Sequence, residues 1–445
     1  KPSVSMELPD IMERARDLLE RRNVESYEIY AMSTDTIRAE AKRGGVDSLA
    51  RSRETGVAVR VLAGGMGFAY GDEPDESLVD AAVSSARYQT KDEFHHLPEV
   101  QDGYPEIDAM DPLVVSMDAD ACIERALRLE QAARDADRRV ENVRKASFSR
   151  SVSQIRIMSS LGVACMFPLT TVSTSIMVTV KDGDDVQSGH DFDFGHSLGS
   201  VNVDEVGRRA AGRAASLIGS RRFTTRRIPV LFDNATSSDI VEFIAESFLG
   251  ENVLKGKSYL KGRLHTLCFS SCLSIRDVPM DVRAADCCPF DGEGVPSRST
   301  DLVEEGVLKA FLYDSYWARR AKTATTGNSV RPSYRSWPTL ASRHLCVARG
   351  KEPIAPILEQ MPVALKITDI MGMHTANPIT GEISVGVNGI VLERGEETYP
   401  IREAALSGNI FEMLSRVVSL GDDERAFGHV LCPSILVDAV DIGAQ

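Results

Sequence analysis

Val57-Ala58-Val59-Arg60-Val61-Leu62-Ala63-Gly64-Gly65-Met66 is the stretch that says most about the fold of this chain. Valine alternates with other residues over its first half, as in a half-buried β-strand. The two adjacent glycines can supply the positive φ angles of a hairpin turn, and Met66–Tyr70 would then run back along the first strand. The sequence therefore predicts an antiparallel β-hairpin at this point.

Helical and strand-like segments surround this hairpin. The helical segments repeat apolar residues every three or four positions, and they are Asp10–Arg22, Glu76–Arg87, Asp118–Arg134, Asp204–Ile218 and a helix from Ser238 to about Gly250. The strand-like segments start at Tyr27 and continue with Lys145–Met158, Thr170–Val180 and Ile228–Phe232. Beyond residue 260, frequent glycine and proline separate short apolar runs such as Glu382–Glu393, which indicates a β-rich region.

A polar, basic and unpatterned run, Gly219–Arg227, separates the two halves. We interpret it as a solvated linker and place a domain boundary there, giving domains 1–225 and 226–445. Local helices mixed with segregated β-rich regions favour an α+β fold over a doubly wound parallel sheet. The prediction is an N-terminal mixed α/β domain followed by a β-rich C-terminal domain with a central helix.

Composition excludes several classes of function. The chain has 445 residues, with 51 Lys+Arg against 65 Asp+Glu and a net charge of −14. This charge argues against sequence-independent nucleic-acid binding and against docking on an anionic membrane. The chain contains no run of 18 apolar residues, so the sequence predicts no membrane-spanning helix. Eight thinly spread cysteines and the lack of a secretory signal favour a cytoplasmic protein with reduced thiols.

Common catalytic motifs do not occur. The chain has no phosphate-binding G-x-x-x-x-G-K-[ST] and no G-x-S-x-G nucleophile elbow. Asp291-Gly292-Glu293-Gly294 is too acidic to hold phosphate, and we expect a tight turn.

Two further groups contain residue types that can bind a metal ion. The six-residue spacing of His190 and His196 fits no common ligand pattern, so a surface hairpin is expected there. Cys268 and Cys272 lie near His265, but we expect buried free thiols because no fourth ligand is evident.

Several short motifs, in order along nearly the whole chain, resemble the TldD/TldE (PmbA) family, whose members were once called modulators of DNA gyrase and are described as zinc-dependent peptidases. These motifs are Gly56–Ala69, Phe290–Pro296, Glu305–Lys309, Thr326–Asn328, Asn377–Glu382, Tyr399–Ile401, Leu406–Asn409 and Gly443–Gln445. In the TldD-like branch, H-E-x-x-x-H on a helix and a later cysteine bind zinc. Such a set leaves one position open for water, whose proton the glutamate takes.

The resemblance places this motif on the helix Asp239–Gly250. The first histidine position is then Val241, the acid position is Glu242 and the second histidine position is Glu246. Cys432 lies near the position of the ligating cysteine, but the glycine-rich sequence that follows it in the TldD-like branch is missing. The chain therefore resembles the TldE/PmbA branch, with no catalytic residues, no metal and no other cofactor of its own.

This resemblance implies a non-catalytic subunit of a cytoplasmic zinc metallopeptidase complex. A TldD-like partner would carry the zinc, and the substrate would be an unfolded or flexible peptide added as a strand beside a sheet edge. One alternative is a homodimeric peptide-binding or scaffold protein without peptidase activity. Another is a peptidase with an atypical metal site made of Glu246, Cys432 and His429.

Overall fold

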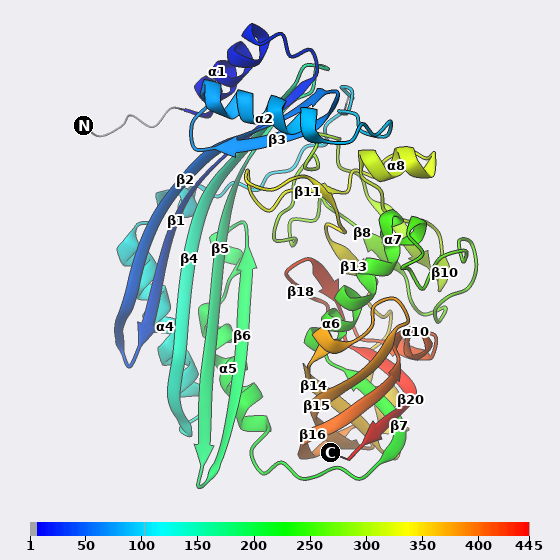
Figure 1. Ribbon diagram of the computed structural model, residues 1–445. Helices are drawn as coiled ribbons and strands as arrows, with labels where there is room; N and C mark the ends of the chain where they lie inside the picture. Colours follow the sequence, from blue (N-terminus) through cyan, green and yellow to red (C-terminus); the bar gives the residue numbers. More distant parts are fainter. Residues whose placement is uncertain (1–6, 102, 445) are drawn as a thin grey trace.

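A computed structural model describes residues 7–101 and 103–444 of the chain. Its N-terminal half is built on one antiparallel sheet with the strand order β3-β2-β1-β4-β5-β6 (Figure 1). The strands are β1 (Tyr27–Lys42), β2 (Gly45–Ala63), β3 (Gly65–Gly71), β4 (Val140–Ser159), β5 (Ala164–Asp182) and β6 (Asp185–Gly195). The predicted hairpin is the β2–β3 pair, in which Ala63 pairs with Gly65 and Gly64 has a φ of 93°.

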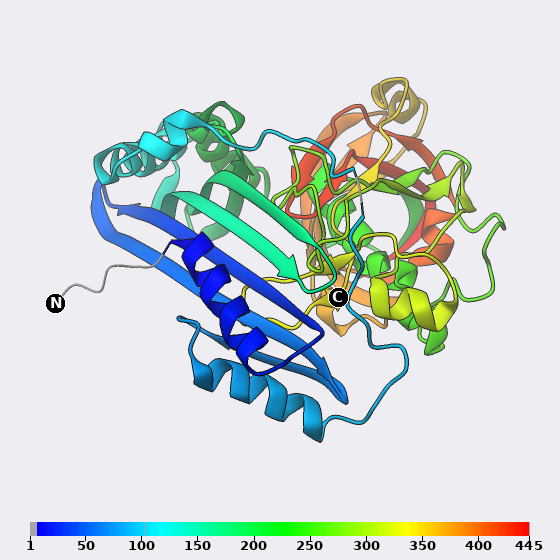
Figure 2. The ribbon, with the colours of Figure 1, turned by 90° about the horizontal axis from the view of Figure 1, so that it is seen from above.

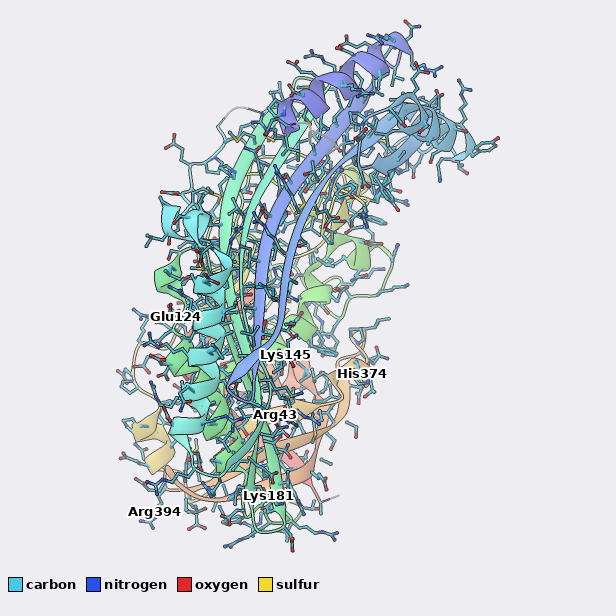
Figure 3. All side chains as sticks on the ribbon, turned by 90° about the vertical axis from the view of Figure 1, so that its left-hand side faces the viewer. Arg43, Glu124, Lys145, Lys181, His374 and Arg394 are labelled. Carbon is cyan, nitrogen blue, oxygen red and sulfur yellow. The ribbon has the colours of Figure 1, made fainter. Side chains whose placement is uncertain are left out.

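Two pairs of helices cover this sheet at its two ends. Figure 2 shows α1 and α2 against one end, and Figure 3 shows α4 on the outer face near the other. Buried apolar side chains of each pair meet those of the strands, forming two separate cores. The N-terminal helices are α1 (Leu8–Arg21), α2 (Glu76–Tyr88), α3 (Pro112–Ser116), α4 (Ala119–Ala136) and α5 (Val203–Ser216), with a 3-10 turn at η1 (Leu198–Ser200).

The C-terminal half contains two six-stranded sheets. In the first, with the order β16-β15-β14-β7-β20-β17, an extra pairing of β16 with β20 closes five strands into a barrel. Its strands are β7 (Arg226–Phe232), β14 (Ala364–Met371), β15 (Glu382–Glu393), β16 (Glu396–Asn409), β17 (Val417–Leu420) and β20 (Ile435–Gly443).

The second sheet has the order β10-β9-β8-β13-β19-β18. Its strands are short: β8 (Ile275–Asp277), β9 (Thr300–Glu304), β10 (Val307–Leu308), β13 (Leu345–Val347), β18 (Arg425–Phe427) and β19 (Val430–Cys432). A two-stranded pair, β11 (Ser329–Val330) and β12 (Thr339–Leu340), stands apart from both sheets. The predicted α+β class and β-rich C-terminal region are thus confirmed.

Helix α6 (Asn234–Ala245) packs among these sheets, and its apolar side chains enter the C-terminal core. The expectation of one helix from Ser238 to Gly250 is wrong at both ends. The helix begins earlier because Asp233 caps it, accepting a hydrogen bond from the Thr236 amide (2.8 Å). It ends at Ala245, and the short elements η2 (Glu246–Phe248) and α7 (Gly250–Leu254) follow.

The remaining short C-terminal helices are α8 (Ser315–Ala321), η3 (Met373–Thr375), α9 (Ala355–Glu359) and α10 (Ile410–Leu414). Among the described residues, no helix combines the length and hydrophobicity needed to span a membrane.

The run between α5 and β7 is only partly a free linker. The Arg221 amide donates to the Pro400 carbonyl (2.9 Å), and its guanidinium lies over the ring of Tyr399 at 4.8 Å from the centroid. The boundary between residues 225 and 226 stays a prediction.

Buried ion pairs join the two halves where the Asp291–Gly294 turn meets the N-terminal sheet. Arg60 of β2 donates to Glu293 (2.8 Å) and also pairs with Glu28 of β1, which in turn binds Arg331. All four side chains are almost fully buried. The turn is present as predicted, since the Gly294 amide donates to the Asp291 carbonyl (3.1 Å). Its role as a junction between the two halves was not predicted.

Candidate functional site

Val241, at the first histidine position suggested by the resemblance, points into the C-terminal core. It is 1% exposed and packs in the same cluster as Ile240 and Ile244. Successive helical residues are about 100° apart, so Glu242 lies on the outer side of α6 and is exposed. A side chain at position 241 therefore faces apolar side chains, while only position 242 faces open space.

Glu246, at the second histidine position, lies beyond the end of α6 in η2. It is exposed, and its Oε2 accepts a hydrogen bond from Asn252 Nδ2 (3.0 Å). Positions 241 and 246 thus belong to different elements and project into different surroundings.

The structure places the two remaining candidate ligands in unlike environments. Cys432 is fully buried in β19, where burial and the Asp423 carboxylate raise the pKa of its thiol well above the ordinary value. His429 is exposed, and its Nδ1 lies 3.2 Å from Asp286 Oδ1, a hydrogen bond that raises the pKa of the imidazole. Within the described part of the chain, no close set of three metal-ligand side chains includes Glu242, Glu246, His429 or Cys432.

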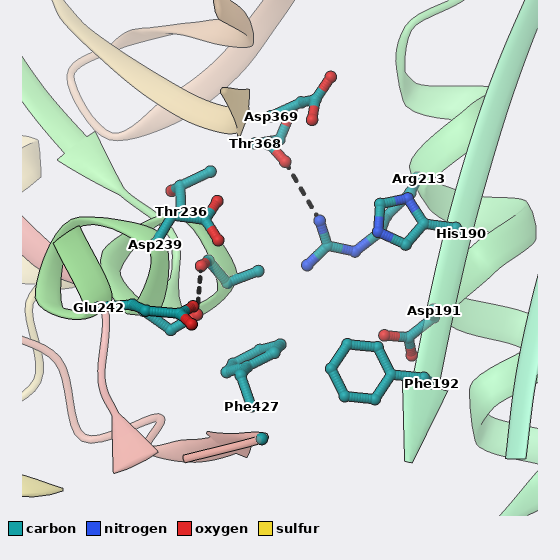
Figure 4. Close-up of a pocket in the computed structure, with 13 residues that line it drawn as sticks. His190, Asp191, Phe192, Arg213, Thr236, Asp239, Glu242, Thr368, Asp369 and Phe427 are labelled. Atoms are coloured by element: carbon teal, nitrogen blue, oxygen red, sulfur yellow. Dashed lines mark hydrogen bonds between the residues drawn. The ribbon is translucent and has the colours of Figure 1, made fainter. Parts of the chain in front are cut away.

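Glu242 instead lines a cavity of about 280 Å³ on the boundary between the two halves, which we name the seam cavity (Figure 4). One wall is formed by the C-terminal half, with Asp239 and Glu242 of α6 and Asp369 of β14. The facing wall is formed by β6 and α5 and carries His190 and Arg213. The seam cavity is thus acidic on the α6 side, while the β6 and α5 side combines the opposite charges of Asp191 and Arg213 with the imidazole of His190.

Arg213 ties the two walls together. Its Nη1 donates to the Thr368 carbonyl (3.2 Å), and its Nη2 pairs with Asp233 Oδ2 (3.2 Å). On the acidic wall, partial burial and the negative charges of Glu242, Asp233 and Asp369 raise the pKa of Asp239 to about 6, although Arg213 opposes this shift. The pKa of Asp239 therefore lies closer to neutral pH than that of an ordinary aspartate.

Two free sheet edges meet beside the seam cavity. Among the described strands, β6 pairs only with β5, and β18 pairs only with β19. The strands face each other through an ion pair between Asp191 and Arg425 (3.0 Å) and through the rings of Phe192 and Phe427, whose centroids are 5.9 Å apart. An exposed strand edge presents backbone donors and acceptors that can pair with an extended chain.

The two histidines considered as ligands lie at different depths. His190 is exposed in β6 and borders the seam cavity. His196 is buried, and each of its ring nitrogens lies 2.8 Å from a carbonyl oxygen, of Thr170 and of Ala284. The expected surface hairpin thus holds for His190, whereas His196 connects the two halves, which its sequence spacing did not indicate.

The expectation of buried thiols is wrong at Cys272, which is exposed, and Cys268 is only half-buried. The segment that carries both lies largely at the surface, so the apolar character of the thiols does not enforce burial. All eight cysteines are free.

Sequence comparison matches three domain models of one family. They are the PmbA/TldA metallopeptidase domain 1 (residues 27–86), central domain (113–218) and C-terminal domain (225–444). Metalloprotease PmbA of Escherichia coli O157:H7 is 28% identical over 371 residues, which is 82% of this chain and 80% of that protein.

Solved structures agree with this match. A candidate modulator of a DNA gyrase from Thermotoga maritima superposes with a TM-score of 0.90 at 25% identity, covering 98% of this chain and 100% of the other. TldE of Thermococcus kodakarensis, at 20% identity and a TM-score of 0.89, shares the fold over 97% of this chain and 100% of its own. Fold and sequence thus define a metallopeptidase-related protein. More narrowly, the chain belongs to the TldD/PmbA family and resembles its PmbA/TldE members.

Proposed function

We propose that this chain is the non-catalytic subunit of a cytoplasmic zinc metallopeptidase complex that acts on unfolded or flexible peptides. The observation that carries the proposal is the direction of Val241, whose position faces the core and has no imidazole to offer a metal. The zinc would belong to a TldD-like partner, and no catalytic ion is expected at α6.

The seam cavity is the proposed peptide site of this subunit. A peptide strand added to the edge of β6 or of β18 would find unpaired backbone groups there and the rings of Phe192 and Phe427 close by. Backbone pairing gives affinity with little dependence on sequence, which suits a flexible substrate. The acids of the α6 wall and the guanidinium of Arg213 on the facing wall can hold the peptide's own charged groups in one orientation.

Two other functions would make different demands on the structure. A homodimeric peptide-binding or scaffold protein would use the same cavity without any zinc-bearing partner. A peptidase with an atypical site would have to bring Glu246, His429 and Cys432 to one ion. The buried thiol of Cys432 and the hydrogen bonds that already engage Glu246 and His429 argue against that assembly.

Co-expression with a family member that carries H-E-x-x-x-H tests the proposal. We expect a complex at equal stoichiometry by size-exclusion chromatography and native mass spectrometry. Chelator-sensitive cleavage of an unfolded peptide should require both chains. A stable homodimer that ignores this partner would support the scaffold function, and cleavage by the purified chain alone would support the atypical peptidase.

The peptide site has its own test. Phe427→Ala should weaken binding of a fluorescent unfolded peptide by about tenfold, because one wall of the site loses its aromatic surface. Leu49→Ala removes an exposed apolar side chain from β2, far from β6 in the strand order, and serves as the matched control. Equal affinities of the two variants, measured by fluorescence anisotropy, would place the peptide elsewhere.

A further inference from the structure

Away from the seam cavity, three side chains of the C-terminal half bring an oxygen, a nitrogen and a sulfur ligand together. They are Asp281, His344 and Cys346, and their ligand atoms all lie within 4.8 Å of one another. None of the three lines the seam cavity. We propose that they form a structural binding site for a zinc-like divalent cation.

The imidazole of His344 is the observation that separates this cluster from a chance grouping. His344 is 0% exposed, yet neither Nδ1 nor Nε2 has a hydrogen-bond partner among the described residues. Leaving a buried polar group without a partner is unfavourable, because the group has lost its hydrogen bonds to water. A cation held by one ring nitrogen would supply the missing interaction.

The backbone brings the ligands to one face. His344 immediately precedes β13 and Cys346 lies within it, so the two side chains, two residues apart in extended chain, project to the same side. Asp281 returns over this face through two turns, in which the Asp281 amide donates to Val278 (3.1 Å) and the Ala284 amide donates to Asp281 (2.9 Å).

Backbone hydrogen bonds hold the ligand-bearing segments in place without any ion. Buried Asp277 accepts hydrogen bonds from the amides of Arg343 (3.0 Å) and His344 (2.7 Å). The Val278 amide donates to the His344 carbonyl (2.8 Å), which fixes the start of the Asp281 loop against β13. Supporting contacts of this kind hold metal ligands in orientation.

The distances suit a small tetrahedral ion. Cys346 Sγ lies 4.0 Å from Asp281 Oδ2. Zinc bonded to sulfur at about 2.3 Å and to oxygen at about 2.1 Å separates the two atoms by about 3.6 Å, so a small side-chain shift closes the site. Nitrogen, sulfur and carboxylate donors together select zinc over calcium or magnesium, and water would fill the fourth position.

Charges around the ligands also favour a cation. Asp277 and Asp286 add negative charge near His344, whereas Arg283 pairs with Asp281 and is shared with Glu424 (2.8 Å). Asp281 therefore keeps its orientation through Arg283. Its Oδ2, which faces Cys346, also accepts a hydrogen bond from Arg283 Nη2 (2.7 Å), so an ion would be held through the remaining lone pair of this oxygen. Because the ion would join a loop to a strand and leave the seam cavity unchanged, its role is structural. The proposal departs from the expectation that this chain holds no metal.

Cobalt binding tests the site directly. The full-length chain, stripped with chelator under reducing conditions, is titrated with Co²⁺ and then with Zn²⁺. We expect one ion per chain and a thiolate-to-cobalt absorption band that zinc abolishes. Cys346→Ser should remove the band, and Asp281→Asn should keep it with at least tenfold weaker affinity. Cys272→Ser changes an exposed thiol elsewhere and should leave the absorption band and the cobalt affinity unchanged.

The outcomes separate this proposal from the proposed function. Absence of the cobalt band in the wild-type chain, or its persistence in Cys346→Ser, would overturn the metal site without touching the peptide-binding subunit. A band lost in Cys432→Ser but kept in Cys346→Ser would move the ion to the family motif region and would overturn both. His344→Ala would not discriminate between these outcomes, because it opens a cavity at a fully buried position and destabilises the fold by itself.

Discussion

The direction of one side chain, Val241, limits what helix α6 can do. Val241→His should not create chelator-sensitive peptidase activity, because the new imidazole would enter the apolar core and Glu246 offers no second imidazole. A buried imidazole without a partner should also lower the free energy of unfolding by about 2–4 kcal/mol. Peptide cleavage with added zinc and urea unfolding measure the two effects.

Glu242→His is the matched control for this substitution. It places the same side chain one residue further along α6 on the exposed side, so stability should change by less than about 1 kcal/mol. Zinc-dependent cleavage by Val241→His at a rate near that of an active relative would refute the non-catalytic assignment.

Asp239 makes stability depend on pH in a definite direction. Its raised pKa of about 6 means that the folded state takes up a proton more readily than the unfolded chain, whose aspartates titrate near 3.9. This contribution destabilises the fold above pH 6 and vanishes as the pH falls below about 4.

Asp239→Asn should therefore stabilise the protein at pH 7.5 by about 1 kcal/mol, a figure reduced for solvent screening, and by much less at pH 4.5. Urea unfolding at both pH values provides the measurement. Glu242→Gln removes one of the charges that raise this pKa and should give a smaller gain of the same sign. A gain equal at both pH values would show that the charge is not its source.

At the scale of elements, sequence patterns predicted the regular elements that bury one face. The β2–β3 hairpin and α1, α2, α4 and α5 appear within a few residues of their expected bounds. The first ten residues of β2, 45–54, were not predicted as strand, because every one of them is exposed and they show no buried face. Their strand conformation depends on pairing with β1, which no alternation of apolar residues records.

The end of α6 could not be predicted from apolar spacing either. Phe243 and Phe248 keep the helical pattern, but Leu249 is extended (φ −77°, ψ 123°). Gly250 packs so closely on the ring of Tyr313 that a Cβ would lie 2.0 Å from it. This close approach of a distant tyrosine is a constraint that the local apolar pattern does not record. The cavity likewise depends on distant segments, β6 and α6. Sequence reasoning considered Glu242, His190 and Asp191 of its lining, but nothing in the sequence indicated that they lie together.

Helix α5 supplies a test of packing between elements. Gly189 of β6 lies directly under this helix, and a Cβ there would be 2.3 Å from the Ala210 carbonyl oxygen. Gly189→Ala should push α5 off the sheet and lower the free energy of unfolding by about 2–3 kcal/mol. Gly212 lies on the exposed side of α5, where a Cβ would meet no described atom beyond its own stretch of helix within 4 Å.

Gly212→Ala is thus the matched control and should stabilise the protein by about 1 kcal/mol, because alanine favours helix. Thermal and urea unfolding of the two variants should shift in opposite directions. A shift of the same sign in both would mean that α5 does not pack on β6 as the structure has it.

At the scale of the whole molecule, the two halves meet along a boundary that is polar as well as apolar. Buried apolar residues of β1 and β4 pack on the C-terminal segment around Phe290. Alongside them run the ion pairs of Arg60 with Glu28 and Glu293. Since the seam cavity lies on the same boundary, the angle between the halves sets the distance between β6 and β18 and hence the width of the proposed peptide site.

Two carboxylates near Glu293, the ion-pair partner of Arg60, make this boundary sensitive to pH. Burial and the charge of Glu293 raise the pKa of Asp291 and of Asp314 to about 7. Their charges therefore oppose folding above pH 7, and this effect weakens as the pH falls towards 4. Arg60 supplies the positive charge that faces Glu293 among these acids.

Arg60→Met keeps most of the buried volume but leaves Glu293 without its ion-pair partner. Breaking a buried pair in this way should lower the free energy of unfolding by about 3–5 kcal/mol. The loss should be larger at pH 8 than at pH 6, because protonation of the neighbouring acids relieves the unpaired charge. Urea unfolding gives the stability, and hydrogen exchange of β6 and β18 reports whether the halves separate.

Arg276→Met is the matched control, because it breaks an exposed pair with Asp301 and should change stability by less than about 1 kcal/mol. A comparably small, pH-independent loss for Arg60→Met would mean that the apolar contacts alone hold the two halves together.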